Sequence, residues 1–435
     1  MPINLQTSIP GPKISALLAR RRAAVLPGVS TMHPIFVERA SGSTVTDVDG
    51  NTFIDFTGGI GVMNVGHGQP AVIDAVTRQA ERFTHVSWQV MGYEAYVEAA
   101  EALVRIAPGD FEKRVLLVSA GVEAIENAVK IARGATKRGA VLCFDHGFHG
   151  RTLLGLSLTG KAVPYKGGLG PFAPEIYRLP FPYPYRGQGV EGSIEHALKT
   201  IVRPEDLAAI VVEPVLGEGG FLVAPVSFLQ ELRDLATRYG IVLILDEVQS
   251  GFGRTGSMFA CQTFGVTPDL MTVAKSLAAG LPLAAVVGRA DLMDTIQPGA
   301  LGGTYGGNPL AAVAALQAIR IIEETLASGH VDRLASRLRA KLEELAARVP
   351  LIGEVRGLGA MMAIELVRDR VTKDPAPAET AAIVAEARAH GLLLLPAGTY
   401  GNVIRFLMPL TTPLEVLDEG LNVLDRALTT ARTAS

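Results

Sequence analysis

The stretch Leu243-Ile244-Leu245-Asp246-Glu247-Val248-Gln249 decides the fold, because an apolar run ends abruptly in charge. The run Val242–Asp246 is short and rich in branched aliphatic residues, which is typical of a strand covered on both faces. A carboxylate at the end of such a strand is costly to bury unless a positive charge pairs with it. Asp246 therefore indicates a partner such as a protonated heterocyclic nitrogen or, alternatively, a cap on the next helix.

The same pattern continues outward from this strand in both directions. Apolar runs predict further strands at Arg114–Val118, Ala140–Phe144, Ala209–Glu213, Leu270–Ala274 and Ala284–Gly288. Helical periodicity lies between them, as at Glu123–Arg133 and Val226–Tyr239. Alternating strands and helices predict an α/β fold with a mostly parallel central sheet flanked by helices. Ligands of such sheets gather at the carboxyl ends of the strands.

The pattern of predicted strands and helices differs on either side of this region. Val45–Phe56 alternates around Asp49-Gly50-Asn51, which predicts a hairpin. After Ile322, helical segments at Val331–Arg348 and Glu379–His390 are interleaved with short strands near Met361–Glu365 and Val403–Phe406. We therefore expect a large domain over residues 59–322 and a smaller α+β domain assembled from residues 1–58 and 323–435.

Composition limits the classes of partner. The 435 residues include 40 basic and 43 acidic side chains, a net charge of −3, which gives no electrostatic case for nucleic acid or an anionic membrane. No apolar run approaches the roughly 20 residues that span a bilayer, and Met1–Lys13 lacks the apolar core of a secretory signal. Cys143 and Cys261 have no partner at metal-ligand spacing. We expect a cytoplasmic protein with free thiols and no metal site.

Three strand ends carry groups suited to a flat, anionic ligand. Ser119-Ala120-Gly121-Val122 opens a helix, whose free N–H groups suit phosphate, although an ordinary turn looks the same. In Phe148-His149-Gly150-Arg151, the aromatic ring suits stacking and the guanidinium suits a carboxylate. A structured loop with His149 bonded to backbone is the alternative there. Glu213 and the glycine-rich loop around Glu218 suit close approach to a ligand or, equally, a solvated turn.

Lys275 ends the strand Leu270–Ala274 within an apolar region. Burial lowers the pKa of a lysine and favours the free amine that Schiff-base chemistry needs, while a structural lysine with its charge in solvent is the alternative. Thr304 precedes Gly306-Gly307-Asn308-Pro309, where its hydroxyl could meet an anion or simply belong to a turn.

Taken together, these segments resemble the class III group of fold-type I, pyridoxal-phosphate (PLP) dependent aminotransferases. The similar segments follow one another in the family's order: SAGVEAIENAVKIAR (119–133), FHGRT (148–152), EPVLGEGGF (213–221), LILDEVQSGFGRTG (243–256), AKSLAAGLP (274–282) and TYGGNP (304–309). Within class III, Ile9–Lys13, DFTGGIGVMNVGH (55–67) and GTYGNVIRFLMPL (398–410) are most similar to bacterial 4-aminobutyrate aminotransferases.

The resemblance implies the cofactor PLP and two catalytic residues. Lys275 would carry PLP as a Schiff base and move a proton, and Asp246 would pair with the ring nitrogen so that the ring accepts electrons. The remaining cofactor-binding residues that it implies are Gly121 and Val122 (phosphate, through backbone N–H groups), Phe148 and Val248 (either side of the ring), His149, Gln249 (the phenolic oxygen) and Thr304. Thr304 would reach the phosphate of a neighbouring subunit, which implies a homodimer or a dimer of dimers.

The resemblance also implies how carboxylates are handled. Arg151 would hold the distal carboxylate of each substrate, and Arg405 the α-carboxylate of glutamate or 2-oxoglutarate. An ω-amino acid has no α-carboxylate, so Glu218 would neutralise Arg405 in that half of the cycle. Ile60, Trp88 and Glu213 would line the pocket, although Trp88 fits a core position equally well.

These roles predict ping-pong transamination between 4-aminobutyrate and 2-oxoglutarate. Other class III donors remain open, namely N-acetylornithine, ornithine, β-alanine and 5-aminovalerate, as does an amino-acid racemase on the same fold. A non-catalytic binding protein is disfavoured because both Lys275 and Asp246 are present. Two departures from the family pattern bear on function: Ala120 and Val122 replace a hydroxyl residue and a small residue in the phosphate loop, and Leu216 stands where related enzymes usually have Gln.

Overall fold

The computed structural model describes residues 2–189 and 193–433 and divides into two compact units. The central unit spans residues 70–327, and the split unit combines residues 1–69 with 328–435. That these units are independent domains with the limits expected from the sequence stays a prediction.

The central unit is built on a seven-stranded sheet with the order β4-β12-β11-β10-β7-β5-β6. β12 runs antiparallel to both of its neighbours, and the other adjacent pairs are parallel. All the strands predicted for this region are present, and β6 is an additional one. The strands are β4 (Lys113–Val118), β5 (Ala140–Phe144), β6 (Ile176–Leu179), β7 (Leu207–Val212), β10 (Val242–Asp246), β11 (Leu270–Val273) and β12 (Ala284–Arg289), with a separate hairpin of β8 (Val215–Leu216) and β9 (Leu222–Val223).

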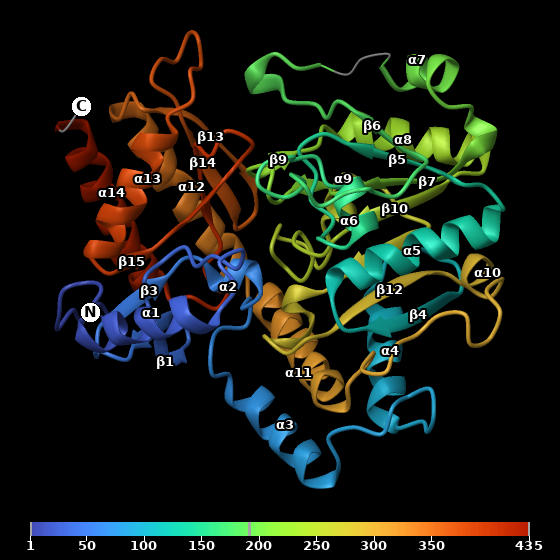
Figure 1. Cartoon of the computed structure of the whole chain (residues 1–435), viewed down its shortest axis with the longest axis horizontal. Coiled ribbons are helices and arrows are strands. Elements are labelled where there is room, and N and C mark those ends of the chain that lie inside the picture. Colours follow the sequence, from blue (N-terminus) through green and yellow to red (C-terminus); the bar gives the residue numbers. More distant parts are fainter. Residues whose placement is uncertain (1, 190–192, 434–435) are drawn as a thin grey trace. The chain divides into compact units, whose positions relative to one another are not determined.

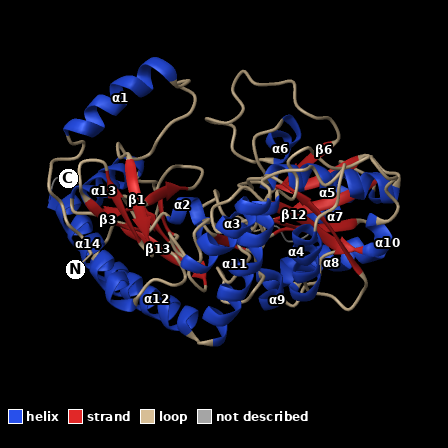
Figure 2. Ribbon diagram, turned by 90° about the horizontal axis from the view of Figure 1, so that it is seen from below, coloured by secondary structure: helices blue, strands red, loops and turns tan. Residues whose placement is uncertain are grey.

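Helices cover both faces of this sheet, which explains why its strands are apolar throughout (Figures 1 and 2). Cys143 packs in one apolar cluster with residues of α5 (Gly121–Thr136), whereas the next residue, Phe144, meets Phe228 of α8 (Val226–Tyr239) edge-on at 5.2 Å. Successive side chains of a strand point to opposite faces, so α5 and α8 lie on opposite sides.

Further helices complete the central unit. They are α3 (Pro70–Arg82), α4 (Glu94–Ile106), α6 (Leu153–Leu158), α7 (Ser193–Thr200), α9 (Ala260–Phe264), α10 (Ala290–Met293) and α11 (Pro309–Ala327), with single 3-10 turns at η1 (Pro184–Arg186), η2 (Pro204–Asp206) and η3 (Lys275–Ala278).

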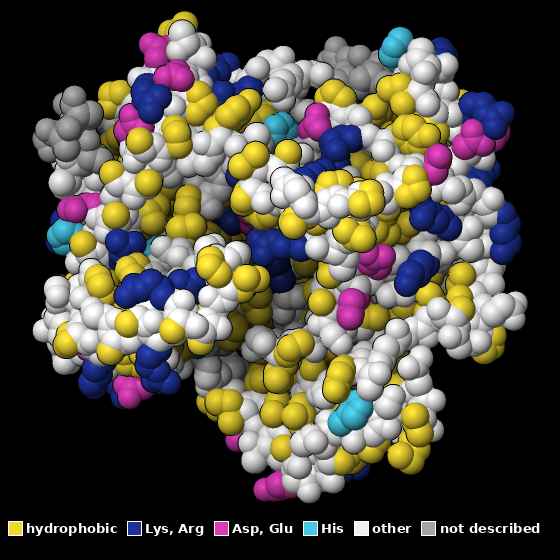
Figure 3. Space-filling model, in the orientation of Figure 1, with side chains coloured by type: hydrophobic (Ala, Val, Ile, Leu, Met, Phe, Trp, Pro, Cys, Tyr) yellow, Lys and Arg dark blue, Asp and Glu magenta, His cyan; other side chains and the backbone are white. Residues whose placement is uncertain are grey.

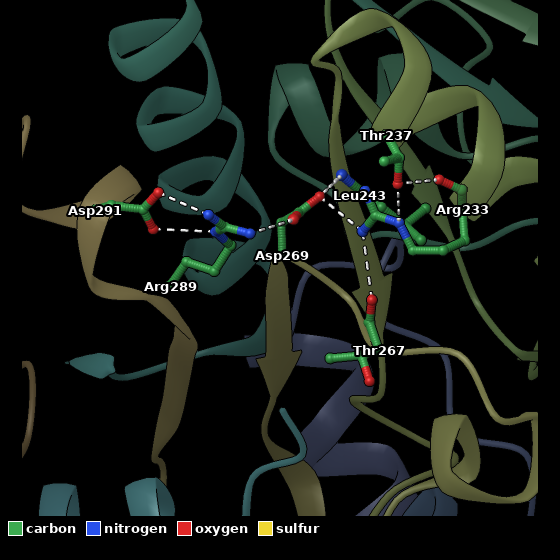
Figure 4. Close-up of polar contacts among 7 residues, drawn as sticks. All are labelled: Arg233, Thr237, Leu243, Thr267, Asp269, Arg289 and Asp291. Atoms are coloured by element: carbon green, nitrogen blue, oxygen red, sulfur yellow. Dashed lines mark hydrogen bonds and ion pairs between the residues drawn. The ribbon is translucent and has the colours of Figure 1, made fainter. Parts of the chain in front are cut away.

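The amino-terminal edge of the sheet is closed by charge pairs around Asp269 (Figure 4). One oxygen of Asp269 accepts hydrogen bonds from the backbone N–H of Leu243 and from Arg233, each at 2.9 Å. Arg289 lies 3.9 Å from the other oxygen and binds Asp291 through two nitrogens. These ion pairs lie at the amino-terminal ends of β10 and β11, whereas Asp246 and Lys275 lie at or just beyond their carboxyl ends.

The split unit contains two four-stranded sheets, ordered β1-β2-β3-β15 and β13-β14-β17-β16. The predicted hairpin is present as β2 and β3, and β15 pairs parallel with β3, so the two ends of the chain share a sheet. The strands are β1 (Val37–Ser41), β2 (Thr44–Asp47), β3 (Thr52–Asp55), β13 (Ile352–Leu358), β14 (Met361–Leu366), β15 (Leu392–Leu393), β16 (Leu395–Ala397) and β17 (Val403–Phe406). The helices are α1 (Pro12–Ala24), α2 (Gly58–Gly61), α12 (His330–Arg348), α13 (Pro377–Ala389) and α14 (Leu414–Thr433).

Surface charge is mixed. On the face drawn in Figure 3, Lys and Arg side chains occur in small groups among acidic and hydrophobic ones. None of the described helices combines the length and the apolar character needed to cross a lipid bilayer.

Candidate active site

Asp246, at the carboxyl end of β10, is buried and accepts three hydrogen bonds. Its Oδ2 accepts from His149 Nδ1 at 2.8 Å, and its Oδ1 accepts from the N–H of Val248 and the hydroxyl of Thr272, both at 3.1 Å. Burial by itself would lower the pKa of His149, but the hydrogen bond and charge of Asp246 outweigh it and raise that pKa. The contact with Asp246 therefore favours the protonated form of the His149 ring. Asp246 needs such a partner, because an isolated buried charge is costly.

Glu213 joins two loops of the site. One of its oxygens accepts from the N–H of Phe148 and the other from the N–H of Gly217, each at 2.8 Å. Burial raises the pKa of this carboxyl to about 7, against the opposing effects of His149 and the two backbone donors. Glu213 thus fixes the loop after β5 relative to the loop after β7.

The amide of Gln249 lies against the backbone of Gly217. A Cβ atom added to Gly217 would stand 2.1 Å from Gln249 Oε1, so a larger residue there would displace the Gln249 amide. This Oε1 is buried and makes no hydrogen bond within the described residues. Buried polar atoms are nearly always hydrogen-bonded, so Oε1 is suited to the hydroxyl of a ligand.

Lys275 follows β11 and opens the turn η3. Its backbone φ is +48°, in the left-handed region that non-glycine residues rarely occupy. Such a conformation costs of order 1–3 kcal/mol and is found preferentially at functional sites. The side chain is partly exposed at the carboxyl edge of the sheet.

The amino terminus of α5 provides backbone donors. The carboxylate of Glu123 accepts from the N–H groups of Ser119 (2.7 Å) and Ala120 (3.1 Å). The N–H groups of Gly121 and Val122 make no hydrogen bond within the described chain, and together with the helix dipole they suit an anion. Gly121 is also close to Val248, because a Cβ on it would lie 3.1 Å from Val248 Cγ1.

Arg151 belongs to a cluster of aromatic and charged side chains. Its guanidinium carbon lies 5.0 Å from the centre of the Tyr165 ring and 5.9 Å from that of Phe148. The two rings meet edge-on at 5.4 Å. The hydroxyl of Tyr165 donates to Glu218 Oε2 at 3.4 Å. The structure therefore brings together Phe148, Arg151 and Glu218, which the sequence singled out separately.

Trp88 and Thr304 lie near another aromatic cluster. The Trp88 ring stacks on Tyr96 at 4.1 Å and meets Tyr93 edge-on at 5.6 Å. Tyr93 in turn donates to the carbonyl of Gly307 at 2.6 Å, which anchors the loop that carries the exposed Thr304. Much of the Trp88 ring is thus engaged in packing.

Ile60 and Arg405 belong to the split unit. Ile60 is exposed and has a left-handed φ of +66°. Arg405, on β17, is among the largest fully buried side chains of the chain. Their part in the site stays a prediction.

The central unit contains groups of the kinds that would bind PLP. They are a buried carboxylate for a ring nitrogen, a buried amide oxygen for a phenolic hydroxyl, two backbone N–H groups for phosphate and a lysine amine for an aldehyde. No group of three or more His, Cys, Asp and Glu side chains placed to hold a metal occurs among residues 2–189 and 193–433.

A family model described as aminotransferase class-III matches residues 25–428. The chain belongs to the class III aminotransferases. It is 50% identical over 413 residues to the 5-aminovalerate aminotransferase DavT of Pseudomonas putida, covering 94% of this chain and 97% of the relative. It is 47% identical over 419 residues to the 4-aminobutyrate aminotransferase GabT of Escherichia coli, covering 96% and 98%. Both the predicted family and the predicted fold class are confirmed.

Solved structures agree with this assignment. An ornithine aminotransferase of Toxoplasma gondii, crystallised with partial occupancy of PLP, superimposes with a TM-score of 0.86 at 30% identity, over 97% of this chain and 95% of the other. This class III aminotransferase is accordingly a PLP-dependent enzyme of fold-type I, as predicted.

Three residues of this site were not predicted from the sequence. Thr272 pairs with Asp246 in the register of β10 and β11, so aligning the two predicted strands would have found it. Thr159, whose hydroxyl accepts from the N–H of His149 at 3.0 Å, and Tyr165 lie in an irregular segment that carries no periodic signal.

Proposed function

We propose that the enzyme transfers the amino group of 4-aminobutyrate to 2-oxoglutarate, giving the semialdehyde and glutamate. The observation that carries the proposal is the likeness, over nearly the whole chain, to relatives named for ω-amino acids. 5-Aminovalerate is the second candidate donor, since the relative with 50% identity is named for it.

We propose Lys275 and Asp246 as the catalytic residues. PLP, when bound, supplies a carbonyl for the substrate amine and a ring that takes up the electrons released at the substrate carbon. Asp246 Oδ2 and Oδ1 accept hydrogen bonds from His149 and Thr272, which hold the carboxyl group in one orientation, and there it would pair with a protonated ring nitrogen. Lys275 Nζ would take the proton from the substrate carbon that bears the amino group.

The remaining cofactor contacts are proposed as follows. Gln249 would hydrogen-bond the phenolic oxygen, the N–H groups of Gly121 and Val122 would bind the phosphate, and Phe148 and Val248 would flank the ring. Backbone donors at α5 need no particular side chain, so the departures at Ala120 and Val122 are compatible with phosphate binding.

Substrate carboxylates would be held by arginines. Arg151 would bind the distal carboxylate and Arg405 the α-carboxylate of 2-oxoglutarate, with Glu218 neutralising Arg405 while an ω-amino acid is bound. Ile60 and Trp88 are proposed to line the pocket, and Glu213 to position its loops.

We also propose a homodimer or a dimer of dimers, in which Thr304 binds the phosphate in the neighbouring subunit. Its exposure on a well-anchored loop supports such a role. Light scattering coupled to size-exclusion chromatography tests the state, and a monomer that binds PLP and transaminates at full rate contradicts it.

The function is tested with single amines and no acceptor. 4-Aminobutyrate should abolish the aldehyde-form absorption of the bound cofactor, and 2-oxoglutarate should restore it. 5-Aminovalerate, β-alanine, ornithine and N-acetylornithine rank the alternatives. Loss of optical rotation of a chiral amino acid, without any net spectral change, would instead identify a racemase. In Lys275→Ala, borohydride should trap no covalent cofactor, and an adduct at another position would overturn the assignment of Lys275.

A further inference from the structure

Arg151 lies between two residues that are held by the same face of α5. Its neighbour Gly150 lies against the side chain of Val122, because a Cβ atom added to Gly150 would stand 2.3 Å from Val122 Cγ2. On the other side of Arg151, the hydroxyl of Thr152 donates to Glu126 Oε1 at 2.6 Å. Val122 and Glu126 are four residues apart in α5, so their side chains lie on one face of that helix. The backbone of Arg151 is thus restrained on both sides by a single rigid element.

The contact of Val122 extends to α6. A Cβ atom added to Gly155, in α6, would stand 2.8 Å from the same Val122 Cγ2. Thr152 accepts a hydrogen bond from the N–H of Gly155 at 3.1 Å and so caps α6. Gly150 has a φ of +112°, which residues with a side chain rarely adopt, so its close approach depends on glycine. The branched side chain of Val122 therefore fills the space that two glycines leave.

We propose that Val122, Glu126 and Thr152 are positioning residues that set which length of ω-amino acid the enzyme prefers. This rests on the proposed function, in which Arg151 holds the distal carboxylate and the N–H groups at the start of α5 hold the cofactor phosphate. One helix then fixes both the phosphate and the backbone of Arg151. Because the amino group of the donor must reach the cofactor while its carboxylate reaches Arg151, the span between these two points selects the number of methylene groups.

The side chain of Arg151 is restrained as well. Its guanidinium carbon lies 5.0 Å from the centre of the Tyr165 ring and 5.9 Å from that of Phe148, and the attraction of the cation to these rings limits its rotamers. Rotamer freedom that is lost before the donor arrives is not lost again on binding. A restrained guanidinium distinguishes donors that differ by one methylene group, whereas a mobile one adapts to several lengths.

The test compares β-alanine, 4-aminobutyrate and 5-aminovalerate, which differ successively by one methylene group. Their kcat/KM values are measured with 2-oxoglutarate, and the ratio of the best donor to the second-best is independent of the fraction of active enzyme. Thr152→Val removes the hydroxyl and keeps the shape of the side chain, and it should narrow this ratio about threefold to tenfold, the size of one lost hydrogen bond. Val122→Ala should narrow the ratio too, and Thr152→Ser, which retains the hydroxyl, should keep the wild-type ratio.

Thr136→Val is the matched control. Thr136 lies at the other end of α5, where its hydroxyl donates to the carbonyl of Ala132 at 2.7 Å and accepts from the N–H of Arg138 at 3.3 Å. The variant loses a comparable pair of hydrogen bonds away from Arg151 and should leave the donor ratio unchanged.

Amide hydrogen exchange of residues 148–155 in the PLP-loaded protein is a second readout, and it needs no turnover. Exchange in this segment should be faster than in the wild type in Thr152→Val, because the hydroxyl no longer holds the segment to α5. It should be unchanged in Thr152→Ser and in Thr136→Val.

The proposal is overturned by a Thr152→Val protein with the wild-type donor ratio or with wild-type exchange of residues 148–155. It is also overturned if the wild type converts the three donors equally well, or if Thr136→Val narrows the ratio as much as Thr152→Val does. The proposed function fails by a different observation, namely that no ω-amino acid alters the spectrum of the wild-type enzyme. The exchange rates decide in either case whether the Thr152 hydroxyl restrains the segment that carries Arg151.

Discussion

Replacing Gly217 by Ala should weaken cofactor binding indirectly. Gly217 has no proposed contact with the cofactor, but the new side chain would displace the amide of Gln249, which has one. The new Cβ would stand 2.1 Å from Gln249 Oε1, and ordinary contact begins at 3.4 Å. The amide of Gln249 must therefore retreat by roughly 1 Å, because the interior around it is close-packed and neither backbone can give way as easily. A hydrogen bond displaced that far is largely lost.

The size of the effect follows from the bond that is lost. A hydrogen bond to a group with ionic character contributes about 1.5–3 kcal/mol, so the Kd for PLP should rise about tenfold to 100-fold. The Kd is measured by titrating the cofactor-free protein with PLP and following the fluorescence of Trp88, the single tryptophan. Gly139→Ala is the matched control, because a Cβ there meets nothing within 4 Å, and its Kd should equal that of the wild type.

A double-mutant cycle tests the route of the effect. In a Gln249→Ala background there is no amide to displace, so adding Gly217→Ala should change the Kd by less than about twofold. The reasoning is refuted if Gly217→Ala binds PLP with the wild-type Kd, or if its effect is the same size with and without Gln249.

Three further perturbations follow from the structure. Asp269→Ala leaves the buried N–H of Leu243 without its acceptor and should lower the free energy of unfolding by about 2–4 kcal/mol in urea denaturation. The control Asp291→Ala removes an exposed ion pair and should lower it by less than about 1 kcal/mol. Equal losses would contradict this reasoning. The pKa of Glu213 is raised from its ordinary value of 4.5 to about 7. Its contribution to stability is therefore full below pH 4.5 and is lost as pH rises through 7, so the thermal midpoint of the wild type should fall over that window. A Glu213→Gln protein with the same pH slope would argue against this. Tyr93→Phe removes the hydrogen bond that anchors Gly307 and should raise the Kd for PLP about fivefold. Tyr239→Phe is the control, because the Tyr239 hydroxyl makes no hydrogen bond in the described chain. A wild-type Kd in Tyr93→Phe would show that this loop does not contribute to cofactor binding.

The sequence predicted the central sheet well because its strands are continuous apolar runs. The limits of β5 and β10 agree to the residue, while β6 escaped prediction because Ile176-Tyr177-Arg178-Leu179, at the edge of the sheet, is short and neither continuously apolar nor regularly alternating. The antiparallel direction of β12 could not be predicted either, because a strand buried on both faces has the same composition in either direction.

The candidate site was predictable where chemistry forces a residue type, and not where contacts arise from loops. Asp246 and Lys275 are conspicuous as charges at the ends of apolar strands. The hydrogen-bond partner of His149 could not be predicted. A bond to the backbone was one alternative from the sequence, whereas the structure pairs His149 with Asp246, 97 residues further along the chain. Tyr165 gave no signal, since an aromatic residue in an irregular segment has no periodicity that would indicate its neighbours.

The charges around Asp246 favour a site that is formed before the cofactor arrives. Asp246, His149 and Glu213 are buried together, and the first two already pair at 2.8 Å. Above pH 7, where Glu213 ionises, the cluster gains a negative charge beside His149 and Asp246. That added charge favours a cation brought against Asp246, such as a protonated ring nitrogen, without any side chain having to reorient. Oriented charge of this kind is effective in catalysis because its reorganisation cost is met during folding. The same charge would serve no purpose in a protein that only binds neutral ligands, because there the unbalanced carboxylate would simply destabilise the fold.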